Sequence, residues 1–377
     1  MSIEIREVKS RKDLHTFVYL PEKIHRRHAS WIPPLYMDER RFFDKSKNPA
    51  FQHNATLLLL AYRDGNPVGR IMGLIPKEYN EAKHQKTARF SYFECNEDRE
   101  VFNALLSAVE RWALAQESTL IVGPMGFSDK EPQGFLTMGF QEKTMMVTNC
   151  NFPYMVDFIE ESGYAPYVEL CQYEVPISEG VPEKYAVYSS RLLERMNFQI
   201  HEFTSTRQIQ AFVRPVFNLI NATYTDIYGF VKISEEEMDD FARRFIPLLN
   251  PKLVKIITHG DGERNVVAFV IAMPDLSDAV KKGRGRLWPL GWYHLLRAFK
   301  TSKRLVLLLG AVKNEMQGKG LDAILAVKLI DSAKALGFNM MDSHLIMREN
   351  TKMRREIERL QGYRLYKEYT IFSKTLV

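Results

Sequence analysis

The amino-acid sequence predicts an α/β protein made of two tandem domains, each with a mixed, mostly antiparallel sheet flanked by helices. The first observation is the length, because 377 residues correspond to two domains at about 150 residues each. The second is the composition, since 45% hydrophobic and 26% charged residues are typical of a globular chain. The third is that strand and helix patterns follow in the same order twice. This divides the chain into residues 1–177 and 183–377, around the turn-rich stretch Pro176–Pro182.

In the first half, β-rich runs alternate with helical patterns. Two apolar runs flank the turn Asp64-Gly65-Asn66 and indicate a hairpin, and an apolar stripe with helical period from Val101 to Trp112 indicates a helix. The predicted strands are Ile3–Val8, Ala55–Tyr62, Val68–Ile75, Ala88–Cys95, Thr119–Val122 and Val168–Val175, and the predicted helices are Glu97–Gln116 and Pro153–Glu161.

The second half repeats this order after three predicted helices. Apolar runs on both sides of Gly260-Asp261-Gly262 indicate another hairpin. The predicted strands are Leu253–His259, Val266–Met273, Arg304–Val312, Asn339–Ile346 and Leu365–Phe372, and the predicted helices are Glu183–Met196, Arg207–Tyr224, Glu235–Leu248, Lys319–Leu336 and Thr351–Leu360. Asn151 precedes Gly163 by the same spacing with which Asn350 precedes Gly362, so the halves also share a residue pattern.

Charge and cysteine content narrow the range of partners. The chain has 52 Lys and Arg against 46 Asp and Glu, and this net charge of +6 predicts no specific nucleic-acid partner. Three widely spaced cysteines without a CxxC motif predict neither disulfides nor a zinc site, so no metal is expected. The N-terminus lacks a secretory signal and no apolar run approaches the ~20 residues of a membrane span. We therefore expect a cytoplasmic protein that is not integral to a membrane.

One segment concentrates positive charge. Eight Lys and Arg residues and no Asp or Glu lie between Lys281 and Arg304. The aromatic residues among them are Trp288, Trp292, Tyr293 and Phe299. This mixture suits an anionic membrane surface, and it would also allow stacking on nucleic-acid bases. The alternative is an insertion that packs its aromatic side chains on the core and leaves its charges in water.

The clearest local motif is Gln317-Gly318-Lys319-Gly320-Leu321, which lies between a predicted strand and a predicted helix. Two glycines at such a junction allow a tight turn and leave backbone N–H groups open to a ligand. The positive end of the helix dipole favours phosphate groups, and Lys319 adds a mobile cation. An ordinary glycine-containing turn between a strand and a helix is the alternative interpretation.

The second half resembles the GNAT acyltransferase superfamily in this motif and in a later helix. The family has a loop of pattern Gln/Arg-x-x-Gly-x-Gly/Ala that opens a helix, then a strand, then an Asn-started helix that ends near Gly-Phe. The matching residues are Gln317, Gly320, Asn350 and Gly362-Tyr363. The resemblance covers roughly residues 200–377 with the motif and residues 1–177 by element order, and it implies two tandem GNAT-like domains.

The resemblance also implies a cosubstrate. In the family, loop amides bind the pyrophosphate of acetyl-CoA or another acyl-CoA, and the preceding strand hydrogen-bonds the pantetheine arm. On this chain the implied residues are Ala311 and Val312 for the arm, and Met316, Gln317, Gly318, Lys319, Gly320 and Leu321 for the pyrophosphate. The Asn350 side chain is expected to face the cosubstrate where the two central strands separate.

Two positions depart from the family pattern. Asp322 replaces the last Gly or Ala of the loop, where its carboxylate is interpreted as a helix cap. Ile357 stands where many members have a general-acid tyrosine.

The first half departs further from the family. Its strand Ala88–Cys95 leads into Glu97, Asp98 and Glu100, without a glycine. These acids put negative charge at the positive end of the helix dipole, so the N-terminal domain is expected to lack a cofactor site.

His344 is the candidate catalytic base, because its strand lies near the expected position of the reacting carbonyl in a GNAT fold. An imidazole with an ordinary pKa of ~6.5 accepts a proton from an ammonium group near neutral pH. Glu315, Asp342 and a water relay are alternatives, and a packed histidine without a catalytic role is another.

Together these observations predict an acyl-CoA-dependent N-acyltransferase. It would transfer an acetyl or other acyl group to an amine of a small-molecule or peptide acceptor by direct attack. Two alternatives remain: a catalytically inactive GNAT-fold binding protein, and a Fem-like transferase that uses aminoacyl-tRNA.

Overall fold

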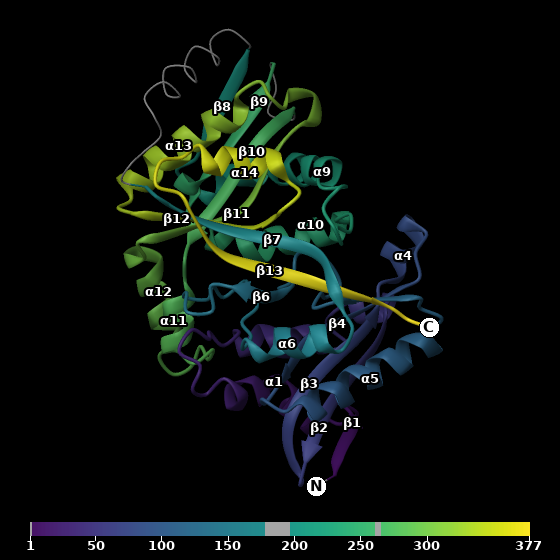
Figure 1. Cartoon of the computed structure of the whole chain (residues 1–377). Helices are drawn as coiled ribbons and strands as arrows, with labels where there is room; N and C mark the ends of the chain where they lie inside the picture. Colours follow the sequence, from purple (N-terminus) through teal and green to yellow (C-terminus); the bar gives the residue numbers. More distant parts are fainter. Residues whose placement is uncertain (1, 178–196, 261–264) are drawn as a thin grey trace. The chain divides into compact units, whose positions relative to one another are not determined.

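The computed structural model describes residues 2–177, 197–260 and 265–377, which form two compact units (Figure 1). Unit 1 comprises Met1–Cys171, Leu276–Ala298 and Lys367–Val377, and unit 2 comprises Gln172–Asp275 and Phe299–Tyr366. Both units are discontinuous in sequence, whereas the boundaries 1–177 and 183–377 divide the chain by repeat. That division stays a prediction, and the predicted helix Glu183–Met196 lies outside the described residues.

Among the described residues the predicted elements occur in the predicted order, with further helices and strands between them, and the predicted helix Arg207–Tyr224 is broken into shorter helices. Up to residue 177 they are β1 (Ile3–Glu7), α1 (Arg11–Ile24), α2 (Tyr36–Phe42), α3 (Ala50–His53), β2 (Ala55–Arg63), β3 (Asn66–Ile75), α4 (Lys77–Lys83), β4 (Thr87–Cys95), α5 (Arg99–Ala115), β5 (Leu120–Gly123), β6 (Phe135–Met138), α6 (Tyr154–Glu161) and β7 (Ala165–Pro176). From residue 197 they are β8 (Phe198–Glu202), α8 (Thr206–Ile209), α9 (Val213–Thr223), α10 (Glu235–Phe245), β9 (Val254–His259), β10 (Val266–Pro274), α11 (Ser277–Lys282), α12 (Gly291–Thr301), β11 (Arg304–Val312), α13 (Leu321–Ala335), β12 (Met340–Met347), α14 (Thr351–Glu358) and β13 (Arg364–Thr375).

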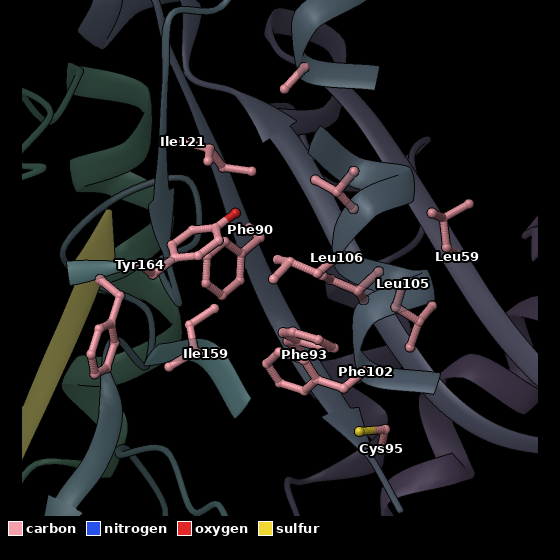
Figure 2. Close-up of a cluster of buried hydrophobic side chains, with 14 of the residues drawn as sticks. Leu59, Phe90, Phe93, Cys95, Phe102, Leu105, Leu106, Ile121, Ile159 and Tyr164 are labelled. Carbon is pink, nitrogen blue, oxygen red and sulfur yellow. The ribbon is translucent and has the colours of Figure 1, made fainter. Parts of the chain in front are cut away.

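The sheet of unit 1 has the strand order β1-β2-β3-β4-β5-β13, and β6 also pairs with β13. β4 and β5 are parallel, and the other paired neighbours are antiparallel. Successive side chains of a strand point to opposite faces. Leu59 therefore packs in the cluster that contains α5, whereas Leu58 and Leu60 pack in the cluster that contains α1. Figure 2 shows the first cluster, in which Phe93 and Phe102 lie together and Leu105 and Leu106 come from the helix beside them.

The sheet of unit 2 has the strand order β7-β12-β11-β10-β9-β8. Its central pair, β11 and β12, is parallel. From β8 to β11, each strand is antiparallel to the next strand in the sheet. Ile256 packs in a cluster with α9, and its neighbour Ile257 packs in a cluster with α13, so helices cover both faces. The predicted fold class, a mixed and mostly antiparallel sheet flanked by helices, is confirmed.

The closing strand of each half belongs to the other unit. The sequence places β7 at the end of the first half, but its residues from Gln172 onward lie in unit 2, where β7 neighbours β12. β13 ends the second half, but from Lys367 onward it lies in unit 1 and pairs antiparallel with β5, with Phe372 opposite Gly123. Tyr369, Ile371 and Phe372 are fully buried, so this strand completes the core of unit 1.

We therefore expect Phe372→Ala to destabilise unit 1 although the residue lies near the C-terminus. Truncating a buried Phe costs about 3–5 kcal/mol, because apolar contacts are lost and a cavity remains. The matched control is Tyr363→Ala, since this aromatic residue is exposed just before β13. Urea unfolding should show a clearly larger loss for Phe372→Ala than for Tyr363→Ala, and equal losses would contradict the assigned place of β13.

Candidate functional site

The two central strands of unit 2 separate soon after they pair. Three residue pairs join β11 to β12: Arg304 with Met340, Leu305 with Met341 and Val306 with Asp342. The register of β11 against β10 then shifts, with Leu308 as the extra residue of a bulge, which bends the strand. Beyond Val306, β11 continues to pair with β10 but not with β12. Apart from Gly310, whose N–H and C=O bond the Tyr224 hydroxyl, the second edge of β11 can therefore offer backbone N–H and C=O groups to a ligand.

The separated part of β11 is apolar but only partly buried. Leu305 and Val306 are buried, whereas Leu307, Leu308 and Leu309 are each half-exposed. Ala311 and Val312, the residues expected to contact a pantetheine arm, follow in the same half-buried stretch. An aliphatic strand with one open edge suits an extended ligand that has amide groups and a hydrocarbon chain.

The loop after β11 turns tightly into α13. A 3₁₀ turn at Asn314–Met316 leads to Gln317, and both glycines of the motif have left-handed backbone angles, with φ +73° at Gly318 and +81° at Gly320. A Cβ atom at Gly318 would have no heavy atom within 4 Å. Gly320 is the N-cap of α13 and has no side chain to cap the helix. The loop can thus present its first helical N–H groups, and the positive end of the dipole, to an anion.

Two lysines accompany this loop. Lys352 Nζ donates to Gln317 Oε1 at 2.9 Å, and Gln317 Nε2 donates to Asn314 Oδ1 at 3.1 Å. Lys319 Nζ lies 3.3 Å from Met316 Sδ, and its side chain is partly exposed. The loop therefore combines ammonium groups with backbone donors, which is the combination that phosphate groups require.

The anomalous Asp322 faces α14. Its carboxyl hydrogen-bonds to Glu356, whose pKa is raised by burial and by the charge of Asp322. Arg359 NH1 donates to Glu356 Oε1 at 2.6 Å and partly balances the pair. The structure thus gives Asp322 a carboxyl partner on the neighbouring helix, a contact that the interpretation as a cap did not include.

Two other predicted residues have structural roles in addition. Leu321 is fully buried in the core beneath α13, so its backbone N–H is the group that can face a ligand. Asn350 is the N-cap of α14, and its Oδ1 accepts from Met353 N at 3.1 Å. Helix capping, a strong preference of Asn, therefore uses the side-chain oxygen that was expected to face the cosubstrate.

His344 lies on β12, two residues beyond the last pair with β11. Its φ is +58°, an unusual left-handed angle for a histidine. Its backbone N–H donates to Asp342 Oδ1 at 2.9 Å. Burial lowers the pKa of His344 to about 4. The imidazole is therefore neutral at pH 7, but with a pKa of about 4 it is a much weaker base than the ordinary histidine expected from the sequence, because burial disfavours its protonated form.

Asp342 is the centre of a buried polar network that the sequence did not indicate. It accepts from the Tyr366 hydroxyl and from Gln172 Nε2 at 2.8 Å, and Arg304 NH1 lies 3.4 Å away. Burial raises the pKa of Asp342. The carboxyl group is enclosed by these partners, so its evident role is to hold β12 in the conformation that carries His344.

Tyr224 is a site residue whose partner was not foreseen. Its hydroxyl donates to Gly310 O at 3.0 Å and accepts from Gly310 N at 3.3 Å, on the separated part of β11. The sequence shows Tyr224 within an aromatic cluster with Tyr228 and Phe230. Nothing in that pattern relates it to a glycine 86 residues away.

The corresponding position in unit 1 is closed by its own charges. β4 and β5 are likewise paired through three residues, from Thr87 to Arg89 on β4. The helix that follows is capped by Asp98, which accepts from Val101 N at 3.2 Å. Arg63 lies 2.8 Å from both Asp98 and Glu100. The N-cap of the helix is thus Gly320 in unit 2. In unit 1 it is Asp98, and this acid and Glu100 form ion pairs with Arg63.

A hollow of about 510 Å³ lies beside this closed helix start. Its lining includes Asn96, Tyr154 and the carboxylates of Glu97 and Asp157. Two acids disfavour an anionic ligand here. Within the described ranges no group of His, Cys, Asp and Glu residues could hold a metal ion. None of the helices described is long and apolar enough to cross a membrane.

Comparison with known proteins places this geometry in context. No protein-family model matches the chain. The bacterial ceramide synthase of Caulobacter vibrioides is 28% identical, over 99% of this chain and 98% of that protein. Protein YghO of Escherichia coli is 25% identical, over 99% of this chain and 95% of that protein.

Solved structures match the arrangement of elements along the whole chain. A tandem GNAT protein from the clavulanic acid biosynthesis pathway aligns over 100% of this chain and 99% of its own, with a TM-score of 0.58 and 12% identity. A GCN5-related N-acetyltransferase from Sphaerobacter thermophilus aligns over 99% and 96%, with a TM-score of 0.52 and 9% identity. These matches confirm the predicted fold: the chain is a tandem-domain protein of GNAT fold.

Proposed function

We propose that the chain is an acyl-CoA-dependent N-acyltransferase with its site in unit 2, and that its acceptor is the amine of a long-chain amino alcohol. The acyl-CoA is the acetyl or other acyl thioester expected from the sequence, and a fatty acyl group is the one that we favour. The observation that carries the proposal is the difference between the repeats. In both, a helix connects the two strands of a short parallel pair, but α13 has an uncapped glycine as its N-cap, whereas α5 is capped by Asp98.

The described residues fit an acyl-CoA. The N–H groups of Gly318, Gly320 and Leu321, together with the Lys319 ammonium, would bind the pyrophosphate, since the N–H groups of Gln317 and Lys319 donate within the loop to Asn314 O and Met316 O. The edge of β11 at Ala311 and Val312 would bind the pantetheine arm. An acyl-CoA supplies an acyl group that is already activated as a thioester. The half-exposed Leu307, Leu308 and Leu309 offer the apolar surface that a long acyl chain requires.

Two groups near the separated strands are the candidates for proton movement. The neutral imidazole of His344 would accept the proton that the acceptor ammonium must lose before its free amine attacks the thioester, although its pKa of about 4 makes it a weak base for this step. The Tyr224 hydroxyl, held against Gly310, is a donor close to the strand that would carry the thioester arm. Ile357, in the family position of a general-acid tyrosine, is buried and cannot take this role.

The acceptor class rests on the named relative. A ceramide is the fatty amide of a long-chain amino alcohol, so a ceramide synthase forms an N-acyl bond, and the similarity to such a protein extends over the whole chain. Direct attack of the amine on the thioester then accounts for the reaction without a covalent enzyme intermediate.

The proposal is tested by incubating the full-length protein with palmitoyl-CoA and sphinganine and measuring the amide by mass spectrometry. Acyl-CoA species of other lengths and a peptide amine serve as comparisons. We expect amide formation that depends on both substrates. Acyl-CoA binding without amide from any acceptor would favour the inactive binding protein, and dependence on aminoacyl-tRNA would favour the Fem-like alternative.

Gly318→Val should lower the affinity for CoA at least about tenfold, because a side chain there enters the space through which the pyrophosphate would approach. The matched control is Gly260→Val in the same unit. Gly260 has φ +78°, and a Cβ atom there would also meet nothing within 4 Å. Both variants therefore bear similar backbone strain, about 1–2 kcal/mol. Isothermal titration should separate them, and equal affinities would refute the loop assignment.

His344→Gln tests the proposed base through its pKa. Because the folded pKa is about 4 and an unfolded histidine has one of ~6.5, the unfolded chain binds the extra proton between these values. The free energy of unfolding of the wild type therefore decreases as the pH falls from ~6.5 to about 4. It should decrease less in the variant, which has no imidazole to protonate. If His344 is the base, the variant should also lower kcat at pH 7 by about 10²-fold or more, measured by thiol release. An unchanged kcat would remove His344 from the reaction.

A further inference from the structure

An exposed apolar surface lies on the segment that links α11 to α12 and on α12 itself. Its five large side chains are 44% to 79% exposed. They are Trp288, Leu290, Trp292, Tyr293 and Leu296, and we call them the α12 surface. One interpretation of the sequence was that the aromatic residues of this segment pack on the core. Trp288, Trp292 and Tyr293 are exposed, so that interpretation is wrong for these three residues. A soluble chain seldom exposes so many large apolar groups within nine consecutive residues without a partner.

The same segment carries exposed positive charge. The exposed cations between Lys281 and Arg304 are Lys281, Lys282, Arg284, Arg286, Arg297, Lys300 and Lys303. Arg286 is paired with Glu22, at 2.7 Å and 3.0 Å, and Lys281 donates to Ala29 O. No Asp or Glu occurs from Lys281 to Arg304, so the segment carries an excess of positive charge that only groups outside it can balance. Its partner should therefore be negatively charged.

Apolar and cationic residues share one side of α12. The exposed positions Trp292, Tyr293, Leu296, Arg297 and Lys300 recur with the helical period, whereas His294, Leu295 and Ala298 between them are half-buried. A helix with this face can lie flat in the plane of a bilayer surface, with its rings at headgroup depth and its cations at the phosphates.

The segment is held firmly by unit 1. The N–H of Tyr36 donates to Gly285 O at 2.9 Å. Gly285 has φ +69°, and a Cβ atom there would overlap the carbonyl oxygen of Pro34. The bidentate pair of Arg286 with Glu22 adds a third attachment. Because the backbone is already ordered, docking costs little conformational entropy.

We propose that the α12 surface, with Lys282, Arg284 and Lys300, docks the protein onto an anionic lipid bilayer. Interfacial tryptophan and tyrosine beside lysine and arginine match the two requirements of such a surface, apolar depth and negative charge. The proposal goes beyond the proposed activity and does not rest on it. It would explain how a chain without a described membrane-crossing helix reaches an acceptor that resides in a membrane.

The test uses the full-length protein without acyl-CoA or acceptor, so that docking is measured apart from catalysis. Vesicles of phosphatidylcholine with about 30 mol% phosphatidylglycerol are compared with pure phosphatidylcholine by sedimentation. We expect binding to the anionic vesicles, weakened by salt, together with a blue shift in emission, since two of the four tryptophans lie on the α12 surface. Failure of the wild type to bind anionic vesicles would overturn the proposal.

The variant Trp288→Ala/Trp292→Ala should reduce vesicle binding at least about tenfold. The matched control is Phe241→Ala/Leu248→Ala, which removes exposed apolar groups of unit 2 that are not part of the α12 surface. Equal losses of vesicle binding in the two variants would overturn the proposal. It would also be overturned if the wild type bound no vesicles but formed a concentration-dependent dimer that the tryptophan substitutions abolish. Turnover of a detergent-dispersed acceptor should be the same in wild type and tryptophan variant, so a failure of docking is distinguishable from a failure of the proposed function.

Discussion

The parallel pairing of β11 with β12 ends at Val306 and Asp342, and the candidate site depends on that point. A strand that loses one neighbour exposes both its apolar side chains and its hydrogen-bonding edge. The bulge at Leu308 and the left-handed backbone of His344 lie directly beyond the last pair, one on each strand. The buried Asp342 network holds β12 at this point, so the separation is built into the core of unit 2.

The two repeats share this geometry but differ in what occupies the start of the following helix. In unit 1 the N–H groups of α5 are used by Asp98, and Arg63 balances the acids around it. In unit 2 the glycines leave the equivalent donors without a side-chain cap. The two repeats thus differ in a short segment at the start of one helix. In unit 1 one of its N–H groups bonds to the protein's own carboxylate, and in unit 2 no side chain caps the helix.

Local signals in the sequence were sufficient for the fold class and for the loop. The apolar stripe of α5 is set by residues three or four positions apart, and the turn at Gly318 and Gly320 by two nearby glycines. Each is a local feature of the sequence, so periodicity and turn chemistry reveal it. Contacts that join distant residues were not accessible in this way. Tyr224 with Gly310, Asp342 with Gln172, and the burial of Phe372 in unit 1 all depend on which strands become neighbours. The exposure of Trp288 depends in the same way on what the surrounding chain leaves uncovered.

We propose that the helix start of one repeat can bind the anionic part of CoA and that of the other cannot. The most direct measurement is the number of CoA molecules bound per full-length chain, by isothermal titration or native mass spectrometry. The account predicts a stoichiometry of one. Two equivalent sites would contradict it, because α5 would then bind a pyrophosphate despite Asp98 and Glu100, and no binding at all would contradict the assignment of the loop at Gly318 and Gly320.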